Sequence, residues 1–368
     1  MKTSWLILRL VIVVCVVSLL LSCHKNDDEP DRINTQTVIF FFPYSADMTS
    51  YFKRNISDIE AAVLNGAFRN ERLIVCISST KDRADVIELR DNKRDTLFHY
   101  DNPDFTTSAD ISQMLSDIIK TAPADKYSLV AGGHGTAWVP ADVKNLSKSF
   151  GGYNTKTGVE NIAYAIQNAG LKMQYILFDG CFMANVETVY ALRNAADYII
   201  GCPTEIMIKG IPYQHCAKFL GDGVLDYDGF CRAFCEFYET YDTPCGTISV
   251  TDCSALDSLA QVMKLINKAH DFDASILGNV QRFDGYQTPV FYDLGDYVAH
   301  LCNDERLLAT FNAQLSKTVS YKAYTEYFYS ERSGKIKINA FSGLSVSPPT
   351  DGNLSLGVEG TQWWKVTK

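Results

Sequence analysis

Two short stretches decide the fold: YSLVAGGHG at residues 127–135 and YILFDGC at residues 175–181. Each begins with an apolar run of the length of a buried strand and ends in glycine beside one reactive side chain. Further apolar runs occur at 38–42, 73–77 and 198–200, and segments with the apolar spacing of helices separate them. Strands that alternate with helices predict a mainly parallel sheet with helices on both faces.

The same patterns predict the other elements of the chain. Helices are expected at 50–68, 108–120 with Ser108 as N-cap, 158–168, 184–196, 230–241, 256–270 and 293–307, a hairpin at 85–100, and strands at 247–250 and 340–346.

His134 and Cys181 each follow the carboxyl end of a predicted strand. Ligands bind at this edge of open parallel sheets, so we expect the two side chains to lie on one rim. Attack by a cysteine needs a nearby imidazole and donors for the oxyanion. The glycines around His134 expose backbone amides, and a helix that begins near Ala184 favours a thiolate just before it. The pattern therefore predicts Cys181 as a nucleophile and His134 as its general base.

The GGHG and DGC segments resemble those of the clostripain family of cysteine peptidases, which are relatives of caspases, gingipains and legumains. The resemblance extends to PTEI at 203–206, GIPY at 210–213 and GLSV at 343–346. It implies a caspase-like three-layer α/β sandwich with a mainly parallel central sheet and helices on both faces. It also implies a cysteine endopeptidase with a dyad of Cys181 and His134. The backbone N–H groups of Gly135 and Cys181 would then form the oxyanion hole.

Asp179 matches the acidic residue that such peptidases use to hold a basic P1 side chain, which implies cleavage after Arg or Lys. A cap on the helix that follows is the alternative role for this aspartate. The segment after His134 departs from the more usual glycine-rich pattern, since it reads Gly-Thr-Ala before Trp138. Gly180 also replaces residues that are more usual before the cysteine. Both departures leave the substrate preference and the level of activity open.

Some members of the family cleave themselves at a basic residue between the histidine and the cysteine. Lys144 and Lys148 lie in that segment, so the resemblance makes them the candidate autoprocessing sites. Some members also need calcium, but this sequence has no calcium loop of the EF-hand type. No cofactor is certain, and a calcium requirement rests on the resemblance alone.

The N-terminus reads as an export signal. Residues 1–22 hold two basic residues and an apolar run shorter than the ~20 residues of a membrane helix, and the run ends in LLSC. The LLSC motif resembles the cleavage box of bacterial lipoproteins, which implies cleavage before Cys23 and acylation of its thiol. An ordinary secretory signal with a chance cysteine is the alternative. We expect residues 23–37 to form a flexible linker, so that the protein is anchored by lipid to the periplasmic face of a bacterial membrane or to the cell surface.

Charge and cysteine usage exclude other classes of protein. The net charge is -9 and the pI is near 5.2, which argues against a nucleic-acid partner. Of the 11 cysteines, nine remain after Cys15 in the signal and Cys23 in the anchor are set aside. No CxxC pair and no zinc spacing occur among them, so no metal site is predicted.

We expect a caspase-like catalytic domain at 38–255 and a C-terminal extension at 256–368 that packs on it. Protein or peptide substrates and the membrane are the expected partners. A non-catalytic cell-surface binding protein that retains the fold is the alternative function. A third reading is another acyl transfer by the same dyad, such as transpeptidation or ester hydrolysis.

Overall fold

Five parallel strands form the centre of the computed structural model, which describes residues 35–368 except 91–92, 140–149, 153–154, 222 and 224. In sheet order they are β9 (Ala196–Gly201), β8 (Met173–Asp179), β5 (Lys126–Gly132), β1 (Gln36–Phe42) and β2 (Glu71–Thr80). Every residue of β1 is buried, because helices cover both faces of the sheet. This burial explains why the central strands appear in the sequence as continuous apolar runs.

Antiparallel strands extend both edges and bring the sheet to nine strands. One edge carries β3 (Arg83–Arg90) and β4 (Lys93–Asp101), which form the predicted hairpin. The other edge carries β10 (Thr247–Asp252) and β12 (Val319–Tyr324). The predicted parallel sheet is confirmed, and its antiparallel strands are confined to the two edges.

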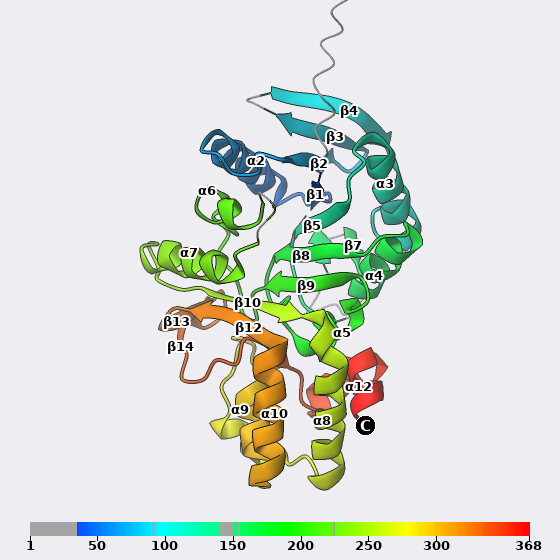
Figure 1. The fold of residues 1–368 in the computed structure, drawn as a ribbon. Coiled ribbons are helices and arrows are strands. Elements are labelled where there is room, and N and C mark those ends of the chain that lie inside the picture. Colours follow the sequence, from blue (N-terminus) through cyan, green and yellow to red (C-terminus); the bar gives the residue numbers. More distant parts are fainter. Residues whose placement is uncertain (1–34, 91–92, 140–149, 153–154, 222, 224) are drawn as a thin grey trace, which may run out of the picture. The chain divides into compact units, whose positions relative to one another are not determined.

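Helices on both faces complete a three-layer sandwich of the caspase-like type, as predicted (Figure 1). One face carries α2 (Thr49–Leu64), α6 (Tyr213–Cys216) and α7 (Tyr227–Glu239). The other face carries α3 (Ser108–Thr121), α4 (Val159–Asn168), α5 (Val186–Leu192) and α8 (Leu256–Ala269). Side chains of a strand alternate between the faces, so Phe40 joins the core beneath α2 while Phe41 joins the core beneath α3.

The remaining described elements lie mostly after α8. They are the hairpins β6 (Phe150–Gly152) with β7 (Thr155–Thr157) and β13 (Tyr327–Ser330) with β14 (Gly334–Lys337), the pair β11 (Tyr292–Asp293) with β15 (Ser345–Val346), the helices α9 (Leu294–Leu301), α10 (Glu305–Thr318), α11 (Asp351–Ser355) and α12 (Gln362–Thr367), and the 3-10 turns Ala217–Phe219, Cys253–Ala255, Ala274–Asn279 and Val358–Gly360.

Several predicted boundaries were wrong, and capping residues explain two of the three that follow. Thr107, and not Ser108, caps α3, because its hydroxyl accepts the amide of Asp110. The helix expected at 293–307 is two helices, since Asp304 caps a new one and accepts two backbone amides. The strand expected at 340–346 is reduced to the two residues of β15.

The region after residue 255 contributes directly to the central sheet, because β12 pairs with β10. The boundary between a catalytic domain and an extension at 255/256 stays a prediction. Across the residues that are described, no helix is both long and apolar enough to cross a membrane.

Candidate active site

The site lies where β5 and β8 end side by side. The two strands are parallel neighbours, and Gly132 is paired with Asp179 at the last position of each. The amide of Gly133 then donates to the carbonyl oxygen of Asp179 at 3.2 Å. The GGHG and DGC segments therefore leave the sheet next to each other, which brings the chain around His134 and around Cys181 to one rim.

Glycine is required for this close approach. A Cβ on Gly135 would overlap the carbonyl oxygen of Cys181, and a Cβ on Gly180 would lie 2.7 Å from the carbonyl oxygen of Gly133. The amide of Gly135 makes no hydrogen bond to any residue that the structure describes, so it remains a donor for a ligand. The bare backbone of the two segments is thus what permits the contact between them.

Cys181 is partly exposed and lies in a turn after β8. Its thiol lies 3.8 Å from the carbonyl oxygen of Ile206. Phe182 has a positive φ of 62°, and its amide donates to Thr204 at 2.9 Å, which bends the chain away from the strand. The expected helix at 184–196 was wrong in extent, because Asn185 caps it and α5 covers only Val186–Leu192.

His134 is fixed from two directions. Its backbone exchanges hydrogen bonds with Gly151, at 3.0 and 3.1 Å. Its side chain is 20% exposed, and its Nε2 lies 2.6 Å from Oδ2 of Asp47. The ring is therefore held by a carboxylate through Nε2, and Nδ1 is the nitrogen that this contact leaves for other partners.

The sequence interpretation missed Asp47, which lies between β1 and α2. Ser45 donates to its other oxygen, Oδ1, at 2.6 Å. Burial alone would raise the pKa of Asp47, but the hydrogen bonds from Ser45 and His134 outweigh burial and hold this pKa below its ordinary value. The only sequence signal for this residue was its place after an apolar run that becomes the neighbour of β5.

Asp179 lies beneath this rim and is almost fully buried, at 6% exposure. Its Oδ2 accepts from Asn55 of α2 and Tyr213 of α6, both at 3.0 Å, and its Oδ1 accepts the amide of Ile211 at 2.9 Å. Burial raises its pKa to about 6, although the amide of Ile211 and the hydroxyl of Tyr213 oppose the rise. Because Asn185 caps the next helix, helix capping is not the role of Asp179.

A segment near the C-terminus contacts the chain that follows the histidine and the chain that follows the cysteine. Ser345 donates its amide to the carbonyl of Ala184 at 3.0 Å. The amide of Ser347 donates to Oε1 of Glu187 at 3.0 Å, and the hydroxyl of Ser347 accepts from the indole of Trp138 at 2.8 Å. Residues after the histidine and after the cysteine are therefore linked through the short segment 345–347.

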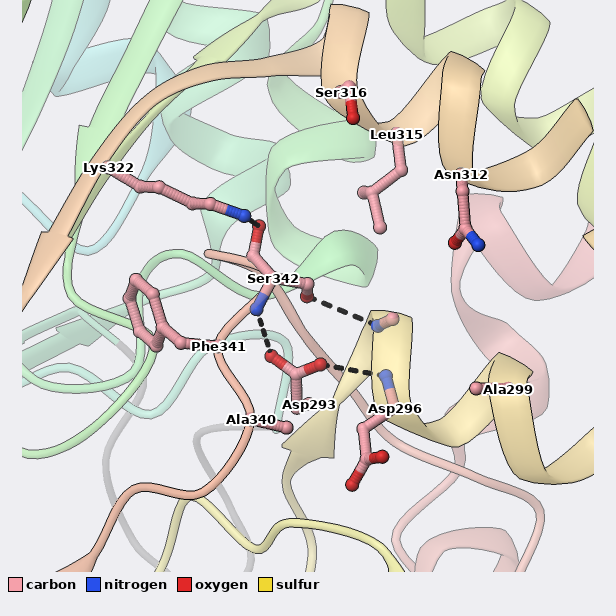
Figure 2. A pocket seen from close by; sticks show the side chains of 11 residues that line it. Asp293, Asp296, Ala299, Asn312, Leu315, Ser316, Lys322, Ala340, Phe341 and Ser342 are labelled. Atoms are coloured by element: carbon pink, nitrogen blue, oxygen red, sulfur yellow. Dashed lines mark hydrogen bonds between the residues drawn. The ribbon is translucent and has the colours of Figure 1, made fainter. Parts of the chain in front are cut away.

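The residues that anchor this segment line a hollow of about 390 Å³ (Figure 2). Asp293 accepts the amides of Ser342 at 2.5 Å and Asp296 at 2.8 Å, so it joins the segment to the start of α9. Lys322 of β12 donates to the carbonyl oxygen of Ser342 at 3.1 Å. Asp293 and Lys322, which line this hollow, therefore fix the chain that leads to Ser345.

The other predicted site residues, Cys23, Lys144 and Lys148, lie outside the described residues. In the part of the chain that is described, no group of three or more His, Cys, Asp or Glu side chains could hold a metal ion. The nine cysteines from Cys76 to Cys302 form no disulfide with one another.

Comparison with known proteins gives a consistent result. The model of the clostripain family matches residues 45–347. A secreted C11 cysteine protease from Bacteroides thetaiotaomicron, "iotapain", is 43% identical with a TM-score of 0.86, over 91% of this chain and 99% of that one. A clostripain from the same species, solved with the peptide inhibitor BTN-VLTK-AOMK, is 50% identical with a TM-score of 0.57, over 58% of this chain and 95% of that one. An inactive zymogen C11 protease from Parabacteroides distasonis is 27% identical with a TM-score of 0.79, over 91% and 98%. No curated protein matches.

Proposed function

The chain belongs to the clostripain family and is a cysteine peptidase that acts on proteins or peptides. From this premise we propose that it is an endopeptidase that cleaves after Arg or Lys, with Cys181 as nucleophile and His134 as general base. The observation that carries the proposal is the contact of two glycine-dependent turns at the ends of β5 and β8.

The proposed reaction uses the ring nitrogen that Asp47 leaves available. His134 Nδ1 takes the proton of the Cys181 thiol as the sulfur attacks the scissile carbonyl carbon. The carbonyl oxygen becomes negative and accepts from the amides of Gly135 and Cys181. The C–N bond then breaks, the leaving amine takes the proton from His134, and a thioester remains. Water, deprotonated by His134, attacks the thioester and releases the acid and the free thiol.

Asp179 is the proposed base of the P1 pocket. With a pKa of about 6, its carboxylate is mainly charged at neutral pH and can attract a guanidinium or ammonium group. Asn55 and Tyr213 hold this carboxylate from two helices, which fixes its direction. The inhibitor bound to the clostripain from B. thetaiotaomicron has the peptide VLTK, whose last residue is lysine, and this supports a basic P1 preference.

We place the protein outside the cytoplasm, attached by an acylated Cys23. The N-terminal box supports the anchor, and a relative described as secreted supports the compartment. Metabolic labelling with an alkyne-tagged fatty acid tests the anchor, since the label should be lost in Cys23→Ala and kept in Cys15→Ala.

The activity test is steady-state cleavage of fluorogenic peptides that end in Arg, Lys, Asp, Asn or Leu, with and without calcium. We expect cleavage after Arg and Lys only, and complete loss in Cys181→Ala. The matched control is Cys302→Ala, because the Cys302 thiol also lies near a histidine, 3.5 Å from Nε2 of His270, but far from this rim in sequence. Activity that survives in Cys181→Ala would refute the dyad, whereas preference for another P1 residue would refute only the role of Asp179.

Self-cleavage at Lys144 or Lys148 is proposed as a step of maturation. Mass spectrometry of purified wild-type protein should show new termini after one of these lysines, and Cys181→Ala should stay intact. An intact wild-type chain with full activity would show that maturation does not need this cleavage.

A further inference from the structure

Three neighbouring strands deliver three chemically distinct side chains to one edge of the sheet. The order β8–β5–β1 is parallel throughout, with Phe41 of β1 beside Ala131 of β5 and Gly132 of β5 beside Asp179 of β8. Cys181 follows β8, His134 follows β5 and Asp47 follows β1. The topology therefore places the histidine between the cysteine and the aspartate.

Asp47 is itself held in a fixed direction. Ser45, only 1% exposed, donates its hydroxyl to Oδ1 at 2.6 Å. The carbonyl oxygen of Ser45 accepts the amides of Met48 at 3.2 Å and Thr49 at 3.0 Å, which ties the turn to the first residue of α2. Both oxygens of the carboxylate are thus used, Oδ1 by Ser45 and Oδ2 by His134.

We infer that Asp47 is a positioning residue that sets the tautomer of His134 for the proposed peptidase reaction. The inference rests on the proposed function. A carboxylate on Nε2 holds a proton there, so the lone pair of the neutral ring lies on Nδ1 and can accept the proton of the thiol. When that proton arrives, the imidazolium keeps a charge-assisted hydrogen bond to Asp47.

Solvent limits how much Asp47 can contribute to the rate of the proposed reaction. The side chain of Asp47 is 53% exposed, so water and salt screen its charge. Proton transfer by a positioned side chain contributes roughly 10²- to 10⁴-fold to rate, and we expect loss of the screened partner to cost about 10- to 100-fold in kcat. KM should change little, because Asp47 would act through His134 and not on the substrate.

The test is Asp47→Asn, which keeps the size of the side chain and removes its charge. The matched control is Asp101→Asn on β4, another exposed aspartate whose Oδ2 lies 3.8 Å from Nε2 of a histidine, His99. We expect Asp47→Asn to lower kcat about 10- to 100-fold with unchanged KM, Asp47→Glu to recover part of the loss, and Asp101→Asn to match wild type.

A second readout does not depend on peptide cleavage. The rate of alkylation of Cys181 by iodoacetamide, followed by peptide mass spectrometry across pH 5–9, reports how well the imidazolium is stabilised beside the thiolate. In Asp47→Asn this profile should move to higher pH. Unchanged kcat and an unchanged alkylation profile, or a rise in activity, would overturn the inference.

The two proposals fail in different ways. If Cys181→Ala retains full activity, the proposed dyad fails whatever Asp47→Asn does. If wild type needs Cys181 but Asp47→Asn is indistinguishable from it, the dyad stands and the role of Asp47 falls.

Discussion

Glu187 is a buried carboxylate whose removal should stabilise the protein. It lies in the first turn of α5, six positions after Cys181, and is 2% exposed. Its Oε1 accepts the amide of Ser347, whereas Oε2 has no hydrogen-bond partner among the residues that the structure describes. Burial raises its pKa to about 7 from 4.5, against the opposing effect of the Ser347 amide.

The sign of the effect follows from proton binding. Between pH 4.5 and about 7 the folded state holds a proton on Glu187 that the unfolded chain has released, so the free energy of unfolding falls as pH rises through this window. The difference between 4.5 and about 7, at about 1.4 kcal/mol for each pH unit, gives roughly 3 to 4 kcal/mol. Glu187→Gln keeps the acceptor for Ser347 and carries no charge. It should be more stable than wild type by up to this amount at pH 8, and equal to it below pH 4.5.

Thermal unfolding from pH 4 to 8.5, in a Cys181→Ala background that prevents autolysis, measures the difference. For the 335 residues of Asn34–Lys368, this gain in the free energy of unfolding corresponds to a rise in Tm of about 4 to 6 °C at pH 8. Asp179 and Asp293 also have pKa values raised by burial, but they are present in both proteins and cancel.

The matched control is Glu88→Gln, because Glu88 is also 2% exposed but is paired with Arg72 and Arg90. These hydrogen bonds outweigh burial and lower the pKa of Glu88. Its neutralisation should therefore destabilise the protein at neutral pH, with the gap closing as the pH falls. Parallel pH curves for wild type and Glu187→Gln, or a less stable Gln variant at pH 8, would refute the reasoning.

Three further predictions concern the rim itself. Gly135→Ala should lower kcat at least about 100-fold, since its Cβ would overlap the Cys181 carbonyl, while Gly278→Ala, where nothing lies within 4 Å, should match wild type in the same assay. Below pH 6, kcat/KM for Arg and Lys peptides should fall about tenfold per pH unit as Asp179 takes up a proton. In Asp179→Asn this kcat/KM should be low at every pH. A flat wild-type profile from pH 6 to 5 contradicts the proposed role of Asp179. Iodoacetamide at neutral pH should label one thiol of the folded mature chain, Cys181, because the other eight described cysteines are buried, and labelling of a second site by intact-mass measurement would show an opening that the structure lacks.

The segments around His134 and Cys181 could be predicted from sequence because both depend on local patterns. An apolar run predicts a buried strand, and the glycines after it mark a turn where backbone is exposed. Asp47 could not be predicted, since it is 87 positions from His134. The contact depends on β1 lying next to β5, and apolar runs alone do not state the order of strands in a sheet.

The contacts made by the C-terminal region could not be predicted from sequence either, because they also join residues that are far apart in the chain. Asn185 donates to Ser345 across 160 positions, and Ser347 reaches Glu187 across the same separation. The motif GLSV at 343–346 was recognised only as a resemblance, with no physical role attached. The structure gives it one: the segment lies against the chain that follows the cysteine turn, and Asp293 anchors its start.

Asp179 and Glu187 are two buried carboxylates close to Cys181 in the sequence, and they have different roles. Asp179 has both oxygens hydrogen-bonded, yet its pKa is still raised to about 6, so a charge is kept there at a cost in stability. A charge retained against burial at the edge where ligands bind is expected of a group that attracts a substrate. Glu187 joins α5 to Ser347, and its Oε2 has no hydrogen-bond partner in the described part of the chain, so its role is to support the chain behind the cysteine turn. Neutralising either residue should therefore relieve a buried charge at neutral pH, but only the change at Asp179 should abolish cleavage after basic residues.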